Sequence, residues 1–117
     1  MNQIRSVYGI KKKSELENLM KKHKVLVVKV EATWCGPCQR MKPLFVEHVN
    51  NLPISVCIVI IDLDQSPELK RYFRVQSVPL LLNIVDGEVM DVTNSGRFED
   101  VDSFFKKLNI LLITDSL

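Results

Sequence analysis

The stretch VLVVKVEATWCGPC, residues 25–38, contains the pattern that decides the fold. Its first half, residues 25–31, is a nearly unbroken run of β-branched and apolar side chains, which is typical of a central strand covered on both faces. A turn follows at residues 32–37, and apolar side chains then recur at intervals of three and four, which predicts a helix over residues 36–50. Pro43 lies inside this helix and should kink it, because proline lacks the backbone donor and crowds the carbonyl four residues earlier.

The segments on either side of this unit supply further strands and helices. Residues 4–10 are expected to form a short edge strand. A capping box, Ser14-x-x-Glu17, precedes leucines at helical spacing and predicts a helix over residues 14–23. A second buried run predicts a strand over residues 54–61, so the chain alternates between strand and helix up to this point.

The second half of the chain contains two helices and a hairpin. Proline at the first helical position, in Ser66-Pro67, marks the start of one helix. Its inward side chains are expected to be Leu69, Tyr72 and Phe73. Strands over residues 80–85 and 88–92 are joined by Asp86-Gly87, a strong hairpin signal because both central turn residues need positive φ. The last helix begins near residue 98 or 99. Its inward face is formed by Val101, Phe104, Phe105 and Leu108.

Parallel β-α-β units followed by an antiparallel hairpin and a closing helix predict an α/β fold, with a mixed central sheet and helices on both faces. The length of 117 residues predicts a single domain over residues 1–117. The composition, 46% apolar and 26% charged, excludes disorder as the main state. The formal net charge of +2 is too small to attract a phosphate backbone, so the composition disfavours a nucleic-acid partner.

Features of the chain ends and the cysteine content indicate a compartment. The charged N-terminal segment contains no readable secretory signal, and no run approaches the roughly 18 apolar residues of a membrane span. Three cysteines are too few, and odd in number, for a secreted domain stapled by disulfides. The sequence therefore predicts a protein of a reducing intracellular compartment, the cytoplasm, with no membrane partner.

Cys35 and Cys38 stand at the junction of the predicted central strand and the following helix, the setting in which a C-x-x-C pair acts as a redox motif. Two cysteines three residues apart in a first helical turn can bring their sulfurs within bonding distance. Cys35 is the expected nucleophile, because the unpaired amides and the helix dipole stabilise its thiolate. Gly36 permits a close bend, and Pro37 removes an amide proton that would lack a partner. Cys38, one turn deeper, is the expected resolving thiol.

The cysteines also admit less specific interpretations. The C-x-x-C pair could be half of a zinc site completed by His23 and His48, but neither histidine has ligand-pair spacing, so we expect no metal. Cys57 lies amid apolar residues and is expected to be a small buried side chain rather than a regulatory thiol.

The motif ATWCGPC, residues 32–38, resembles the active site of the thioredoxin family. Pro43, the dipeptide Val78-Pro79, Gly87 and Gly96 also match family positions. The resemblance implies the thioredoxin fold, with a cis peptide bond within that dipeptide. It further implies a flat, mostly apolar surface on which target peptides dock through backbone contacts. The residues expected on this surface are Trp34, Gly36, Pro37, Val78, Pro79 and Gly96.

The similarity covers about residues 4–108 and implies dithiol–disulfide exchange with protein disulfides. In this reaction the Cys35 thiolate attacks a target disulfide, and Cys38 then attacks the mixed disulfide and releases the reduced target. The resulting Cys35–Cys38 bond is the redox-active disulfide, and no bound cofactor is implied. A donor resembling thioredoxin reductase, supplied with electrons by NADPH, would restore the dithiol.

Lys29 departs from the family pattern, in which a buried aspartate at this position is the proposed proton acceptor for the resolving thiol. The lysine usually paired with that aspartate aligns with Ile60, so both members of the pair are absent. A buried ammonium needs a partner, and Glu31 on the same strand face is the expected one. A charged Lys29 near the sulfurs would lower their proton affinity and make the protein more oxidising, whereas a neutral Lys29 would be a base for Cys38. Both hypotheses stay open.

Two further departures bear on binding. Leu80 stands where the family usually has threonine, from which we expect an altered peptide preference. Residues 110–117 form an extension that begins with four apolar residues and continues past the usual end of the family's chain. Either the last helix extends over its own sheet in a monomer, or this run forms a partner or weak homodimer surface. Alternative functions are a thioredoxin-fold interaction subunit with an incidental dithiol, and a disulfide oxidase or isomerase.

Overall fold

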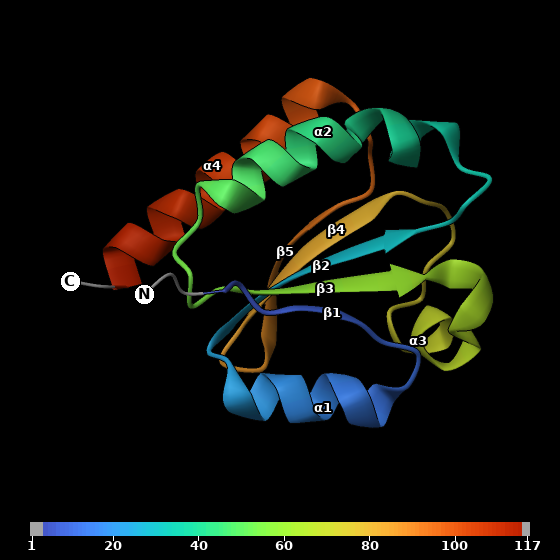
Figure 1. Ribbon diagram of the computed structural model, residues 1–117, viewed down its shortest axis with the longest axis horizontal. Coiled ribbons are helices and arrows are strands. Elements are labelled where there is room, and N and C mark those ends of the chain that lie inside the picture. Colours follow the sequence, from blue (N-terminus) through green and yellow to red (C-terminus); the bar gives the residue numbers. More distant parts are fainter. Residues whose placement is uncertain (1–3, 116–117) are drawn as a thin grey trace.

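The computed structural model describes residues 4–115 (Figure 1). Strands and helices alternate along the chain until a hairpin and a long helix close the fold. The elements are β1 (Val7–Gly9), α1 (Lys13–Lys22), β2 (Val25–Glu31), α2 (Gly36–Asn50), β3 (Cys57–Asp62), the 3₁₀ turn η1 (Leu63–Gln65), α3 (Pro67–Tyr72), β4 (Leu80–Val85), β5 (Glu88–Thr93) and α4 (Phe98–Asp115).

The strands form one mixed, five-stranded sheet in the order β1-β3-β2-β4-β5. β1 and β2 both pair in parallel with β3, whereas β4 pairs antiparallel with β2 and with β5. The turn between β4 and β5 contains Asp86 and Gly87 at φ values of 51° and 80°, the left-handed conformation that a tight hairpin requires. The predicted parallel units and antiparallel hairpin are both confirmed.

Helices cover both faces of the sheet, with α2 and α4 on one side and α1 and α3 on the other (Figure 1). The central strand β2 supplies side chains to both cores, as its unbroken apolar sequence predicts. Val28 and its alternate neighbours contact the core under α1 and α3, and Val27 contacts the core under α2 and α4. The inward face predicted for the last helix is fully buried. Its members are Val101, Phe104, Phe105 and Leu108.

The predicted capping box of Ser14 and Glu17 is wrong. α1 begins one residue earlier, with Lys12 at its N-cap, so Ser14 lies within the first turn. The Glu15 carboxylate accepts hydrogen bonds from the backbone N–H groups of Lys12 and of the residue before it, at 3.0 and 3.1 Å. Glu15 occupies the third helical position, from which a side chain can reach back to the cap, whereas Glu17 lies two residues further along the helix.

Two other expectations about the elements are wrong. β3 begins at Cys57 rather than at residue 54, because the Val56 N–H donates to the Pro53 carbonyl at 3.0 Å and closes a turn there. Tyr72 does not point inward, since its side chain is 46% exposed. The next residue, Phe73, packs against the core instead, and neighbouring residues at the end of a six-residue helix cannot both face the sheet.

The last helix continues to Asp115, well beyond the expected buried face. Leu112 packs against the core under α2 and α4, as the interpretation of a helix extended over its own sheet requires. Ile110 and Ile113 are 56% and 66% exposed, so the partner-surface interpretation stays a hypothesis. Residues 116–117 of the extension lie outside the described residues. None of the helices in the described part of the chain combines the length and apolar character needed to cross a membrane.

Candidate redox site

The candidate site lies where β2 gives way to α2. Cys35 is the N-cap residue of α2, with extended backbone angles, and its sulfur accepts a hydrogen bond from the Cys38 N–H at 3.1 Å. Gly36 and Pro37 occupy the first two helical positions, where backbone N–H groups have no acceptor within the helix. The positive end of the helix therefore faces the Cys35 sulfur, and this environment stabilises a thiolate.

Cys35 and Cys38 form a disulfide, with their Cα atoms 5.3 Å apart. This separation is within the usual range for bonded cysteines. Both residues are buried together with Ala32 in a small cluster at the end of the sheet. The adjacent Trp34 is 66% exposed, which confirms the prediction that its side chain lies on the surface beside the cysteines.

The other residues predicted for the docking surface come from two further loops near the disulfide. The Val78-Pro79 peptide bond is cis, as predicted, and the Val78 carbonyl oxygen lies 3.7 Å from the Cys35 sulfur. Gly96 approaches so closely that an added Cβ would lie 3.1 Å from the Pro37 Cβ and 3.1 Å from the Pro79 Cγ. The structure therefore brings together predicted docking residues that are up to about sixty positions apart in the sequence.

Two polar residues that hold this site were not predicted from the sequence. Asn94 donates its side-chain N–H groups to the carbonyl oxygens of Ser77 at 3.1 Å and Pro79 at 2.9 Å. It thereby fixes the loop of residues 73–79, which contains the cis proline and is called the docking loop below. Asp64 accepts a hydrogen bond from the Trp34 indole at 2.7 Å. The only sequence signal for Asp64 is its place just after a parallel strand, at the sheet edge where strand ends meet.

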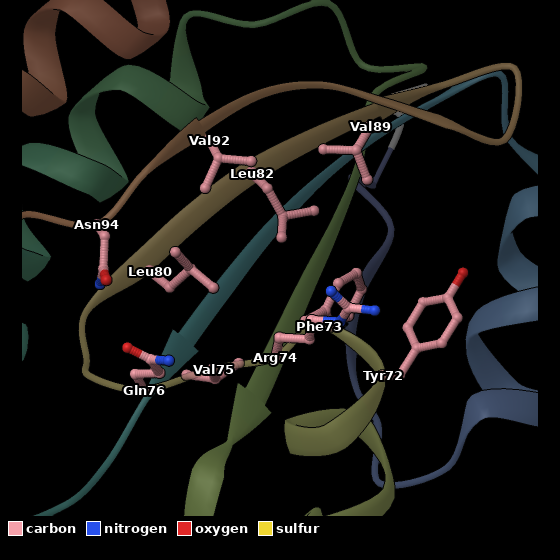
Figure 2. Close-up of a pocket in the computed structure, with 10 residues that line it drawn as sticks. All are labelled: Tyr72, Phe73, Arg74, Val75, Gln76, Leu80, Leu82, Val89, Val92 and Asn94. Atoms are coloured by element: carbon pink, nitrogen blue, oxygen red, sulfur yellow. The ribbon is translucent and has the colours of Figure 1, made fainter.

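A hollow of about 540 Å³ adjoins the docking loop on the α3 side of the sheet. Figure 2 shows apolar side chains of β4 and β5 on one side of it and Tyr72 and Phe73 on the other. Leu80, the residue that departs from the family's threonine, is buried and forms part of this wall. Asn94 lies at the same wall, so the hollow and the docking loop share a structural support.

The family model described as Thioredoxin matches residues 7–108 of the chain. The chain belongs to the thioredoxin family. Thioredoxin H5 of Oryza sativa subsp. japonica is 32% identical over 94 residues, which are 80% of this chain and 69% of that protein. Thioredoxin of Mycoplasmoides gallisepticum is 34% identical over 82 residues, 70% of this chain and 81% of that protein. The crystal structure of reduced Schistosoma mansoni thioredoxin pre-protein superposes with a TM-score of 0.77 at 30% identity, covering 87% of this chain and 97% of that chain.

Membership of the thioredoxin family supports thiol–disulfide oxidoreductase activity as the general function. Thioredoxins need no prosthetic group, and the disulfide of Cys35 and Cys38 provides the redox-active pair. Within residues 4–115, no three His, Cys, Asp or Glu side chains gather in a way that could hold a metal ion. His48 instead pairs with Asp102 at 2.7 Å and stacks on Phe105, which ties α2 to α4.

The chain contains a buried lysine, paired with a half-buried glutamate, at the position where its family usually has a carboxylate. Lys29 is 2% exposed, and its Nζ lies 2.8 Å from the Glu31 Oε1, which confirms the predicted pairing. The ammonium also lies 5.1 Å from the centroid of the Phe45 ring, and Ile60 is its register partner on β3. Within the described residues, no recorded contact joins Lys29 to either sulfur, so its effect on the thiols stays a hypothesis.

Cys57 lies on β3, away from the redox pair. Its side chain is fully buried, and burial raises the pKa of its thiol to about 11. A thiol with so high a pKa is almost entirely protonated at neutral pH and is a poor nucleophile. The prediction of a small buried side chain at Cys57 is therefore confirmed.

Proposed function

We propose that this thioredoxin reduces disulfide bonds in target proteins, with Cys35 as the nucleophile and Cys38 as the resolving thiol. The observation that carries the proposal is the position of Cys35 at the N-cap of α2, where the Cys38 N–H already points at its sulfur. A thiolate at this position accepts the same hydrogen bond in a stronger, charge-assisted form. The dipole of the fifteen-residue helix adds to this stabilisation.

In the proposed reaction, the Cys35 thiolate attacks one sulfur of the target disulfide and displaces the other as a thiolate. Cys38, once deprotonated, attacks Cys35 in the mixed disulfide, releases the second target sulfur and closes the Cys35–Cys38 bond. Two electrons pass from the protein to the target, and the two target sulfurs take up the protons that the dithiol loses. The proposed donor that restores the dithiol is a reductase supplied with electrons by NADPH.

The proposed target is an extended segment that lies across the surface formed by Trp34, Pro37, the cis-proline loop and Gly96. Backbone contacts at such a surface allow many sequences to bind. Leu80 makes the neighbouring hollow more apolar than threonine would, so we expect a preference for target segments with an apolar side chain there. Because both thiols must be reduced between cycles, we propose a reducing intracellular compartment, the cytoplasm, as the location.

The test is reduction of insulin disulfides by the protein in the presence of dithiothreitol. We expect the Cys35→Ser variant to lose at least 100-fold in rate, because no other thiol of the described chain occupies the N-cap position of α2. We expect the Cys38→Ser variant to make the first attack and accumulate as a mixed disulfide, visible by mass spectrometry. Full activity of Cys35→Ser, or a mixed disulfide through Cys38 in wild type, would overturn the assignment of roles.

A second candidate function, net oxidation or isomerisation of disulfides, is favoured by one observation, the buried Lys29 in place of an acid. If its charge favours the dithiolate, the protein has a higher reduction potential than a typical thioredoxin. Equilibration with glutathione buffers measures this potential. Lys29→Met and Lys29→Asp should then lower it, while Lys21→Met on α1 should not. An unchanged potential in both Lys29 variants removes Lys29 from the redox mechanism.

A further inference from the structure

A second cavity, of about 380 Å³, lies between α2 and the β1–β3 side of the sheet, apart from the disulfide. Its walls are apolar on both sides: Phe45, Val46 and Val49 come from α2, and Val7 and Ile58 come from the strands. Pockets that bind small molecules fall in the range of about 300–1,000 Å³ and are mostly apolar with a few placed polar groups. The size and the walls of this cavity fit that description.

The polar groups of this cavity are mainly cationic. Arg5, Lys29 and Lys42 line it, against the single carboxylate of Glu31. Arg5 donates to the carbonyl oxygens of residues 52, 53 and 56 at 2.6–3.1 Å, so its position is fixed while its charge meets no acid there. Lys42 is exposed on α2, and no ion pair is recorded for it in the described chain. The cavity therefore carries a surplus of positive charge.

Lys29 gives the cavity a charged group that is placed inside the protein rather than at its rim. Its ammonium has three N–H donors. One is directed to Glu31 at 2.8 Å, and the face of the Phe45 ring lies 5.1 Å from Nζ. Within residues 4–115 these are its recorded partners, which leaves donor capacity at the cavity wall. A buried ammonium gains strongly from an added anionic acceptor, because little water competes for it.

We propose that this cavity binds a small amphipathic carboxylate, such as a medium-chain alkyl acid or an aryl acid. The carboxylate would lie between Lys29 and Lys42, and the apolar body would fill the space between Phe45 and the strand side chains. A single carboxylate is favoured over an anion with two charges, because the Arg5 guanidinium is already directed to three carbonyl oxygens and Glu31 already accepts from Lys29, so a second charge would lack a partner. This binding does not depend on the thiol chemistry.

Octanoate is the probe, measured by titration calorimetry with the full chain, and octanol and octylammonium are the matched neutral and cationic controls. We expect saturable binding of one octanoate per chain, at least tenfold weaker binding of octanol, and no binding of octylammonium. Lys29→Met, which keeps the side-chain length without the charge, should weaken octanoate at least tenfold and remove its advantage over octanol. Lys21→Met, on the opposite face of the sheet, should leave all three titrations unchanged.

A second variant and a second readout keep the test decisive if Lys29→Met does not fold. Lys42→Met changes an exposed side chain and should weaken octanoate severalfold without loss of the native fold. Amide chemical-shift changes on octanoate addition should concentrate at Val46, Val49 and Ile58. Equal binding of octanoate and octanol, shift changes centred on Val89 and Val92 of the other hollow, or no saturation overturns the proposal. None of these outcomes bears on insulin reduction, so the two proposals fail separately.

Discussion

Gly96 determines how closely the two halves of the redox site approach. The Cβ of an alanine there would meet Pro37 and Pro79 at 3.1 Å, and both neighbours are ring atoms of limited freedom. We predict that Gly96→Ala lowers the kcat/KM of insulin reduction about tenfold and the free energy of unfolding by about 1–2 kcal/mol. The matched control is Gly9→Ala, since the nearest atom to a Cβ at Gly9 is 4.0 Å away. Loss of activity in Gly9→Ala as well would show that the effect is not local to the site.

The buried Cys57 thiol lowers the free energy of unfolding at alkaline pH. Burial raises the pKa of its thiol to about 11 in the folded protein, from an ordinary value of 9.0. Between these values the unfolded chain loses a proton that the folded protein keeps, so the free energy of unfolding falls as pH rises through this window. We predict that wild type loses on the order of 2 kcal/mol more than Cys57→Ala between pH 8.5 and 11.

Urea unfolding at a series of pH values measures this difference, with Cys57→Ala subtracting the other groups that titrate in the same range. Iodoacetamide provides a second check on the native dithiol form at pH 8. Cys35 should react readily, whereas Cys57 should react only in denaturant. Rapid alkylation of native Cys57 would contradict both its burial and its raised pKa.

Side chains within one strand were easier to predict than side chains that meet across the molecule. The pair of Lys29 and Glu31 follows from the alternation of a strand, which places residues two apart on one face. The roles of Asn94 and Asp64 were not predicted, because each forms its hydrogen bond with a distant residue. Asn94 is 15 positions from Pro79, and Asp64 is 30 positions from Trp34. No periodic pattern encodes such contacts. For the same reason the sequence did not reveal the cavity lined by Lys29 and Lys42, whose walls come from four elements, β1, β2, α2 and β3.

The start of α1 is stabilised by Glu15 rather than by Glu17. The Glu15 carboxylate accepts two backbone hydrogen bonds, whereas Glu17 forms an exposed ion pair with Lys13 at 3.8 Å. We predict that Glu15→Ala lowers the free energy of unfolding by about 1 kcal/mol, as loss of a helix cap does. Glu17→Ala, the matched control, should change it by less than about 0.5 kcal/mol. Urea unfolding of both variants decides, and equal effects would contradict the observed cap.

Element type followed from the sequence more readily than element boundaries. The β-branched run before Cys35 and the Asp86-Gly87 turn each admit one interpretation, and both are confirmed. Boundaries at residues 13 and 57 differ, because they depend on a few hydrogen bonds, two accepted by the Glu15 carboxylate and one donated by the Val56 N–H. Such bonds add about 1 kcal/mol each, and hydrophobic spacing does not register them.

The order of strand types was enough to predict the layers of the whole molecule, because parallel units require helical crossovers and a hairpin does not. The oligomeric state could not be predicted in this way, since it depends on how the extension of α4 is covered. Leu112 contacts the core, whereas Ile110 and Ile113 face outward at 56% and 66% exposure. Two isolated isoleucines offer far less area than the roughly 1,200–2,000 Å² of a stable protein interface. We therefore propose a monomer.

The last prediction separates the monomer from a partner surface on the extension of α4. We predict that Ile110→Ser/Ile113→Ser leaves sedimentation and melting temperature unchanged, whereas Leu112→Ala lowers the free energy of unfolding by about 1–2 kcal/mol. Analytical ultracentrifugation and thermal unfolding measure these effects. A wild-type dimer that dissociates in the double variant would instead establish the two isoleucines as an interface.

The same double variant distinguishes an interaction subunit from an enzyme in cells. If cells tolerate serine at both Cys35 and Cys38 but not the double isoleucine variant, binding at this surface is the function, and the dithiol is incidental.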